Sequence, residues 1–244
     1  MHNVISAQMY KCFKTKGFYI LLMIALLSTV FDLIKVTTTL QSNPELKIEG
    51  FTSTYDALSG GLFLLLVGIY AALVFSSDYT SLSIRQIIGK GTKRTAYILG
   101  SLLTVTVVSL IISSAAYVAA FLRGTFIGSG TGTFDGLMMI RFLVVIIVFG
   151  FMYVAFTALI ANITRKTSLT MLISIFTPPI LQLVAVSITS LAKIDVLYDP
   201  ITMMDVATSV KTSTQDYLIA VIIYFCAGIL LTYMSIIVGK KKDL

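Results

Sequence analysis

Six apolar runs, separated by short polar segments, constrain this chain more than any other feature of its sequence. Each run holds 18 to 26 residues, and a helix that rises ~1.5 Å per residue needs ~20 residues to cross ~30 Å of hydrocarbon. The runs cover more than half of the 244 residues, so only short connectors remain. The sequence therefore predicts an all-α integral membrane protein with a single transmembrane domain, 1–244, whose six spans are 18–36, 58–75, 96–121, 137–160, 169–191 and 217–238.

The charged residues sort to alternate sides of these spans. When the connectors are assigned alternately to the inside and the outside, starting inside, the inside set carries 12 Lys and Arg and 2 acidic residues. The rest of the chain carries 6 Lys and Arg and 9 acidic residues. Because loops that stay in the cytoplasm keep Lys and Arg, both termini are predicted to be cytoplasmic. The net charge of +7 then reports membrane topology, and it indicates no nucleic-acid partner.

The first sixteen residues are predicted to form an amphipathic helix that lies on the inner membrane surface. At 100° per residue, Ile5, Met9 and Phe13 fall on one face. Lys11 and Lys14 fall on the other face, where they would meet anionic lipid headgroups. The alternative is a basic tail that only enforces topology.

The segment 78–94, between the second and third spans, is the chemically distinctive part of the chain. Asp78 is predicted to cap a short helix, which carries an apolar stripe and ends at a glycine. A cytosolic loop needs no apolar stripe unless the bilayer surface or another protein covers it. The stripe is Ile84, Ile87 and Ile88, and the glycines are Gly89 and Gly91.

This segment resembles the coupling segment of ABC-2 type transporter permeases. In that family it runs from an acidic residue through Gly-Thr-(Ile/Leu)-Arg and aliphatic residues to a Gly or Pro shortly before Ser-Arg. The matching residues here are Asp78, Ser83-Ile84-Arg85 and Gly91-Thr92-Lys93-Arg94. The departures are Leu82 where the first Gly is common, Ser83 in place of Thr, and Lys93 in place of Ser.

The resemblance implies a bacterial cell-membrane permease of the type V exporter kind, with six spans, an interfacial N-terminal helix and a cytoplasmic coupling helix. Its implied partners are a separate ABC ATP-binding subunit, which would hydrolyse the ATP, a second permease copy and membrane lipid. Its implied cargo is an amphipathic or hydrophobic substrate such as a peptide, bacteriocin, antibiotic or toxin. The residues expected to couple to the ATPase are Asp78, Ser83, Ile84, Arg85, Ile87, Ile88, Gly91 and Arg94.

Two adjacent prolines lie mid-way along the fifth predicted span. Pro178 and Pro179 remove two backbone donors and clash with the preceding turn, so the helix is predicted to bend there. With Gln182 one turn further on, the bend is interpreted as a flexing point beside a translocation path. A static kink that only helps packing is the alternative.

The polar residues elsewhere give weaker indications. Arg141, in the first turn of the fourth span, is predicted to be paired or to extend toward the interface. The connector 192–216 is predicted to contain a helix that begins at Asp199-Pro200, or else to be a plain loop. The glycine-rich stretch 128–132 is read as a flexible turn, and Asn162-Ile163-Thr164 is discounted as a glycosylation acceptor because it faces the cytoplasm.

No catalytic constellation is found in the sequence. The single His and two distant Cys cannot form a metal site or a nucleophile–base pair, and no phosphate-binding Gly-x-x-x-x-Gly-Lys-Ser/Thr loop occurs. The sequence thus predicts no enzyme activity and no cofactor of its own. Two other functions stay open: an ATP-independent secondary transporter or channel, and a membrane sensor subunit that transports nothing.

Overall fold

The computed structural model describes residues 2–42, 49–51, 53–54, 62–80, 84, 88–89, 91–127, 130–132, 136–192 and 214–241. Within this part of the chain the regular structure is helical throughout. The helices are α1 (His2–Lys14), α2 (Lys16–Ser42), α4 (Leu62–Thr80), α6 (Arg94–Ile127), α7 (Gly136–Thr164), α8 (Thr167–Ala192) and α10 (Thr214–Lys241). Side chains are not described for residues 29–36 and 39–42 of α2, nor for the last residues of α8.

Long apolar helices make up most of the molecule. Four of them, within the described residues, are long and apolar enough to cross a membrane: Arg94–Ile127, Met139–Thr164, Thr167–Val184 and Thr214–Gly239. They correspond to the third to sixth predicted spans. For the first two predicted spans, α2 and α4, the apolar stretches with described side chains are Lys16–Ser28 and Leu64–Tyr79. The described part of the chain therefore contains four candidate membrane spans, judged by length and composition.

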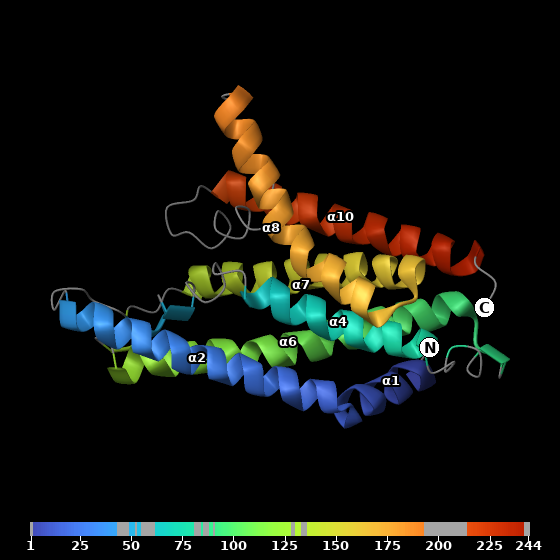
Figure 1. Cartoon of the computed structure of the whole chain (residues 1–244), viewed down its shortest axis with the longest axis horizontal. Helices are drawn as coiled ribbons and strands as arrows, with labels where there is room; N and C mark the ends of the chain where they lie inside the picture. The colour runs from blue at the N-terminus through green and yellow to red at the C-terminus, as the bar shows by residue number, and fades with distance from the viewer. Residues whose placement is uncertain are drawn as a thin grey trace.

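α6 and α7 form the centre of the bundle, and the other helices pack around them. α10 lies along α7, α2 lies along α6, and α4 contacts α6, α7 and α8 (Figure 1). The candidate spans differ in how much of their apolar stretch is buried inside the protein. The buried share is 50% for α6 and 61% for α7, against 17% for α8 and 17% for α10. Since lipid tails are as apolar as leucine, the buried fraction identifies the central helices better than hydropathy does.

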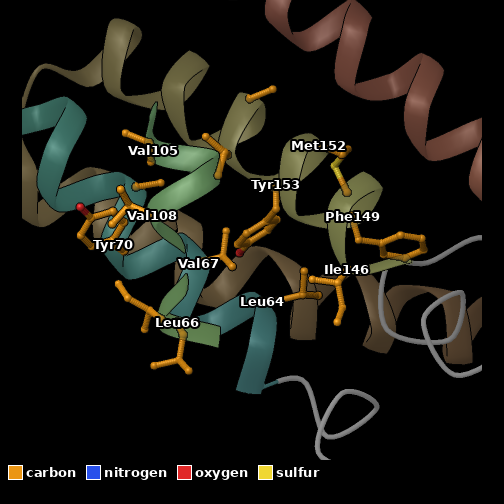
Figure 2. Close-up of a cluster of buried hydrophobic side chains, with 14 of the residues drawn as sticks. Leu64, Leu66, Val67, Tyr70, Val105, Val108, Ile146, Phe149, Met152 and Tyr153 are labelled. Atoms are coloured by element: carbon orange, nitrogen blue, oxygen red, sulfur yellow. The ribbon is translucent and has the colours of Figure 1, made fainter. Parts of the chain in front are cut away.

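The core is a continuous apolar cluster where α4, α6 and α7 meet (Figure 2). Val67 of α4, Val105 of α6 and Phe149 of α7 are completely buried in it. Gly68 of α4 allows a close approach, because a Cβ built there would lie 2.7 Å from the ring of Tyr153. Small residues at such contacts let membrane helices pack closely without a hydrophobic driving force.

The helices alternate in direction, so the ends of the predicted inside segments gather at one end of the molecule. The start of α6 contacts both α1 and the end of α10: a Cβ on Gly100 would lie 2.9 Å from Val4, and one on Gly239 would lie 2.8 Å from Ile98. The chain termini accordingly lie at the same end (Figure 1). We call this end of the molecule the α1 end.

Two helices continue past the ends of the predicted spans. The first outside connector was expected to begin at residue 37, but α2 continues to Ser42. The second predicted span was expected to end at residue 75, but α4 continues to Thr80. In both places polar residues that read as a loop extend a helix instead. The expected helix start at Asp199-Pro200 lies outside the described residues.

The glycine-rich stretch forms a specific contact in its described part. Gly130 and Gly132 have positive φ angles of 109° and 78°. The carbonyl of Gly130 accepts a hydrogen bond from the N–H of Gly50 (3.0 Å), and that of Thr131 accepts one from Phe51 (3.4 Å). The turn therefore holds the described residues of the segment 49–54 (49–51 and 53–54) against the far end of α6.

Candidate functional site at the α1 end

Asp78 is the centre of the most polar part of the described bundle. The prediction that it caps a new helix is wrong: it lies in the last turn of α4, and only 1% of its surface is exposed. A carboxylate is unfavourable near the C-terminal end of a helix, where the helix dipole is negative, and a buried charge needs partners. Partners from two other helices explain why Asp78 stays within α4.

Those partners come from α1 and α6. The Lys11 ammonium forms an ion pair with one carboxylate oxygen of Asp78. The Tyr97 hydroxyl donates a hydrogen bond to the other oxygen. The Gln8 amide donates to Tyr97 Oη at 2.9 Å and lies 3.5 Å from Asp78. We call these four residues the Asp78 cluster; it joins α1, α4 and α6.

The Asp78 cluster shows that α1 packs against the helices of its own chain. The predicted helix is present, and Tyr10 and Lys14 are exposed on one face. Its other face, however, is covered by this chain and not only by lipid: Cys12 is fully buried. Burial raises the pKa of the Cys12 thiol, with a smaller upward contribution from the Asp78 charge, so the thiol stays protonated and unreactive near neutral pH.

The remaining predicted residues of α1 follow this arrangement. Ile5, Met9 and Phe13 are half-buried, and the Phe13 ring meets the Phe18 ring edge-on at 5.1 Å. Lys11 was expected to face lipid headgroups, but it turns inward because a buried carboxylate offers a stronger partner than a solvated phosphate. Lys14 keeps the outward position that the helical pattern predicted.

A second polar cluster lies beside the first and joins α4, α7 and α10. The Asn162 amide donates hydrogen bonds to Ser235 Oγ at 2.7 Å and to the Ser235 carbonyl at 3.1 Å. The Tyr79 hydroxyl donates to the Asn162 carbonyl oxygen, and the Arg165 guanidinium lies 5.8 Å from the centre of the Tyr79 ring. We call Tyr79, Asn162 and Ser235 the Asn162 cluster.

Part of the predicted coupling segment packs against these two clusters. Ile84 is 5% exposed and lies in a small cavity with Tyr79, Tyr97 and Ile98. The cavity holds about 20 Å³, room for about one water molecule, so it is no ligand site. Ile84 was expected to be covered by an ATPase. Instead, this chain itself buries the Ile84 side chain.

The end of the segment is more accessible. Ile88 is half-buried, and Gly89 and Gly91 are exposed. Gly91 has a φ of 89°, and its N–H donates to the Ile88 carbonyl at 2.9 Å. The left-handed backbone expected of a glycine that ends this helix is thus present at Gly91, and most of the helix itself lies outside the described residues. Arg94 follows as the first residue of α6, and the predicted residues Ser83, Arg85 and Ile87 lie outside the described part of the chain.

The predicted kink in α8 contributes no residue to either cluster. α8 continues through Pro178 and Pro179, and its ribbon changes direction in the middle, so that its second half leaves the bundle (Figure 1). Pro178 is buried, Pro179 is exposed and Gln182 is half-buried. The bend is present, and whether it borders a translocation path stays a prediction.

Arg141 is paired, as its position at a helix start suggested. Its guanidinium donates to Thr214 Oγ1 at 2.8 Å and lies 5.3 Å from the centre of the Tyr217 ring. These contacts join the start of α7 to the start of α10. Across the described residues, no group of three or more His, Cys, Asp or Glu side chains is placed to hold a metal ion.

Sequence reasoning missed most members of the two clusters. Gln8, Tyr97 and Ser235 were not singled out, and Asn162 was considered only as a glycosylation acceptor. One signal was available: each is a hydrogen-bonding side chain within or beside an apolar run, where such groups need a partner.

Comparison with known proteins adds no relative. No protein-family model matches this chain, and no curated protein sequence matches it.

Proposed function

We propose that this chain is the membrane-spanning permease subunit of an ATP-driven exporter of the ABC-2 type. The observation that carries the proposal is the joining of the segment with the coupling motif to the N-terminal helix. Asp78 begins that motif, and it binds Lys11 of α1 and Tyr97 of α6. A push on the segment 84–94 would therefore reach three helices at once.

In this proposal the α1 end faces the cytoplasm and all six apolar runs cross the bacterial cell membrane. The gathering of the basic segments at one end supports this orientation. A separate ATP-binding subunit would dock on the accessible end of the segment, at Ile88, Gly89 and Lys93, all at least partly exposed. Ile84 would transmit force from inside the bundle and would not touch the ATPase.

The path for cargo would involve a second permease copy and the bent α8. Beyond Pro179, Ile180, Leu183 and Val186 are exposed apolar side chains, on a helix half that leaves its own bundle (Figure 1). The cargo would be amphipathic or hydrophobic, as the apolar spans favour.

The test is co-purification of an ATP-binding subunit with this chain from native membranes, using Ile88→Asp. A carboxylate placed in a docking contact without a partner costs several kcal/mol, enough to abolish a micromolar interface. We expect Ile88→Asp to lose the ATPase while the permease still reaches the membrane and elutes as the wild type does. The matched control is Tyr10→Asp, on the exposed face of α1, which should keep the ATPase.

Two outcomes would contradict the proposal. If Ile88→Asp keeps the ATPase, the docking site does not lie on this segment. If no ATPase co-purifies with the wild-type chain, the proposed exporter function is wrong. A secondary transporter or a sensor is then favoured.

A further inference from the structure

A cavity of about 600 Å³ lies between α6 and α7, in the half of the bundle away from the α1 end. Its long walls run from Leu110 to Phe121 on α6 and from Met139 to Ile147 on α7. Its volume lies within the ~300–1,000 Å³ typical of ligand pockets. Neither cluster at the α1 end contributes a residue to it. We call it the α6–α7 cavity.

The segment 49–54 forms a wall at the far end of this cavity. Phe51 and Thr54 line the cavity, and the Phe51 ring meets the Phe121 ring edge-on at 5.1 Å. Two backbone hydrogen bonds to the glycine turn hold the segment in place. Gly124 lets it approach α6, because a Cβ there would lie 2.7 Å from the Glu49 carbonyl oxygen. A ligand from water would have to pass this wall.

The side of the cavity faces the membrane instead. Val118 on α6 is 58% exposed, and Leu143 and Ile147 on α7 are 50% and 52% exposed. Both helices are candidate membrane spans, so these side chains meet hydrocarbon. An occupant therefore enters sideways, from the bilayer.

The lining of the cavity favours an apolar occupant. The Ser114 hydroxyl donates to the Ile111 carbonyl at 2.8 Å, and the Thr54 hydroxyl donates to the Gly50 carbonyl at 3.0 Å. Both donors are thus used within their own segments. Apart from the buried Tyr117 hydroxyl, the rest of the wall consists of aliphatic, aromatic and thioether groups, so burial of apolar area favours an occupant here.

The dimensions favour a single hydrocarbon chain. From Leu110 to Phe121 a helix rises about 16 Å, close to half of the ~30 Å hydrocarbon core and so to the depth of one leaflet.

We propose that the α6–α7 cavity binds one acyl chain of a membrane phospholipid from the leaflet opposite the α1 end. The bound chain fills the space between the two central helices and completes their packing. The site needs no ATP-binding partner and no cargo, so it is independent of the exporter proposal. The segment 49–54 keeps the chain end from water.

The test uses the full chain in lipid nanodiscs that contain a phosphatidylcholine with a photoreactive diazirine in its acyl chain. After irradiation, we expect labelled peptides to concentrate in residues 110–121 and 139–147. Val118→Trp and Leu143→Trp should each reduce this labelling by roughly tenfold, because an indole takes up the space of the chain. The wild-type chain contains no Trp, so the fluorescence of each single Trp also reports whether it lies in an apolar site.

Ile222→Trp and Leu230→Trp on α10 are the matched controls, since both positions are 59% exposed and line no part of the cavity. They should leave the labelling of α6 and α7 unchanged. Labelling spread evenly over the exposed faces of α6, α7 and α10 would overturn the proposal. So would labelling that persists in both cavity variants, or that only a free diazirine fatty acid produces.

Discussion

The two ends of the bundle are held together by different kinds of contact. At the α1 end, the Asp78 and Asn162 clusters join five helices through directional hydrogen bonds and an ion pair. In the opposite half, hydrogen bonds join Arg141 to Thr214 and Gly50 to Gly130, but an apolar cavity lies between α6 and α7 and the second half of α8 leaves the bundle. The first end has one satisfactory geometry, because each polar group needs its partner. The second can change shape at little cost, because lipid replaces lost apolar contacts.

Removal of the Lys11 charge is expected to give the largest loss of stability. In Lys11→Met the Asp78 carboxylate stays buried without its ammonium partner, and such broken pairs cost about 3 kcal/mol. Asp78→Asn should cost less, since the Lys11 side chain is 33% exposed and can reach water. The measurement is the free energy of unfolding in mixed detergent micelles.

The control for this comparison is Lys14→Met, which removes an exposed charge from the same helix. It should change the free energy by less than about 0.5 kcal/mol. Equal effects of Lys11→Met and Lys14→Met would mean that the Asp78 cluster does not hold α1 in place.

Loss of the Asn162 amide is expected to give the next largest decrease in the free energy of unfolding. Asn162→Leu removes hydrogen bonds to Ser235 and Tyr79, and at ~0.6 kcal/mol for each interhelical bond the total is about 2 kcal/mol. Ser235→Ala keeps the Tyr79 bond and the bond to the Ser235 backbone, so it should cost about 0.6 kcal/mol. The same unfolding assay measures both, and a ratio near one would show that the amide does not join the three helices.

The sequence predicted the helical elements better than their contacts. The apolar runs predicted α6, α7, α8 and α10 because hydrocarbon thickness sets the length of a span. The glycine turn at Gly91 followed from local backbone preference. Asp78 was misplaced because its position depends on Lys11, 67 residues earlier in the chain. No local pattern shows that partner, and a carboxylate before a polar stretch looks like a helix cap.

Substitution of the prolines is expected to give the smallest change in stability. Helix propensity favours Ala over Pro by up to ~3 kcal/mol in an exposed interior, but neighbours adapted to the bend offset this gain. We expect the Pro178→Ala, Pro179→Ala variant to unfold within about 1 kcal/mol of the wild type. Export of a dye-labelled amphipathic peptide from ATP-loaded vesicles should nevertheless fall, because a straighter α8 no longer leaves the bundle.

Unchanged export in this variant would make the bend a packing feature. Failure of the variant to assemble would show instead that the bend shapes the fold. Either result would weaken the contrast between a fixed α1 end and an adaptable opposite half.

The position of α1 has a consequence for the order in which the protein forms. Val4 packs against Gly100, and Lys11 and Gln8 find their partners only in α4 and α6. At ~5–20 residues per second, the ribosome needs roughly 5–20 s after Lys11 to complete the chain through Tyr97. The earliest segment to be made is thus among the last to dock, because its partners are complete only once the third long helix has been made.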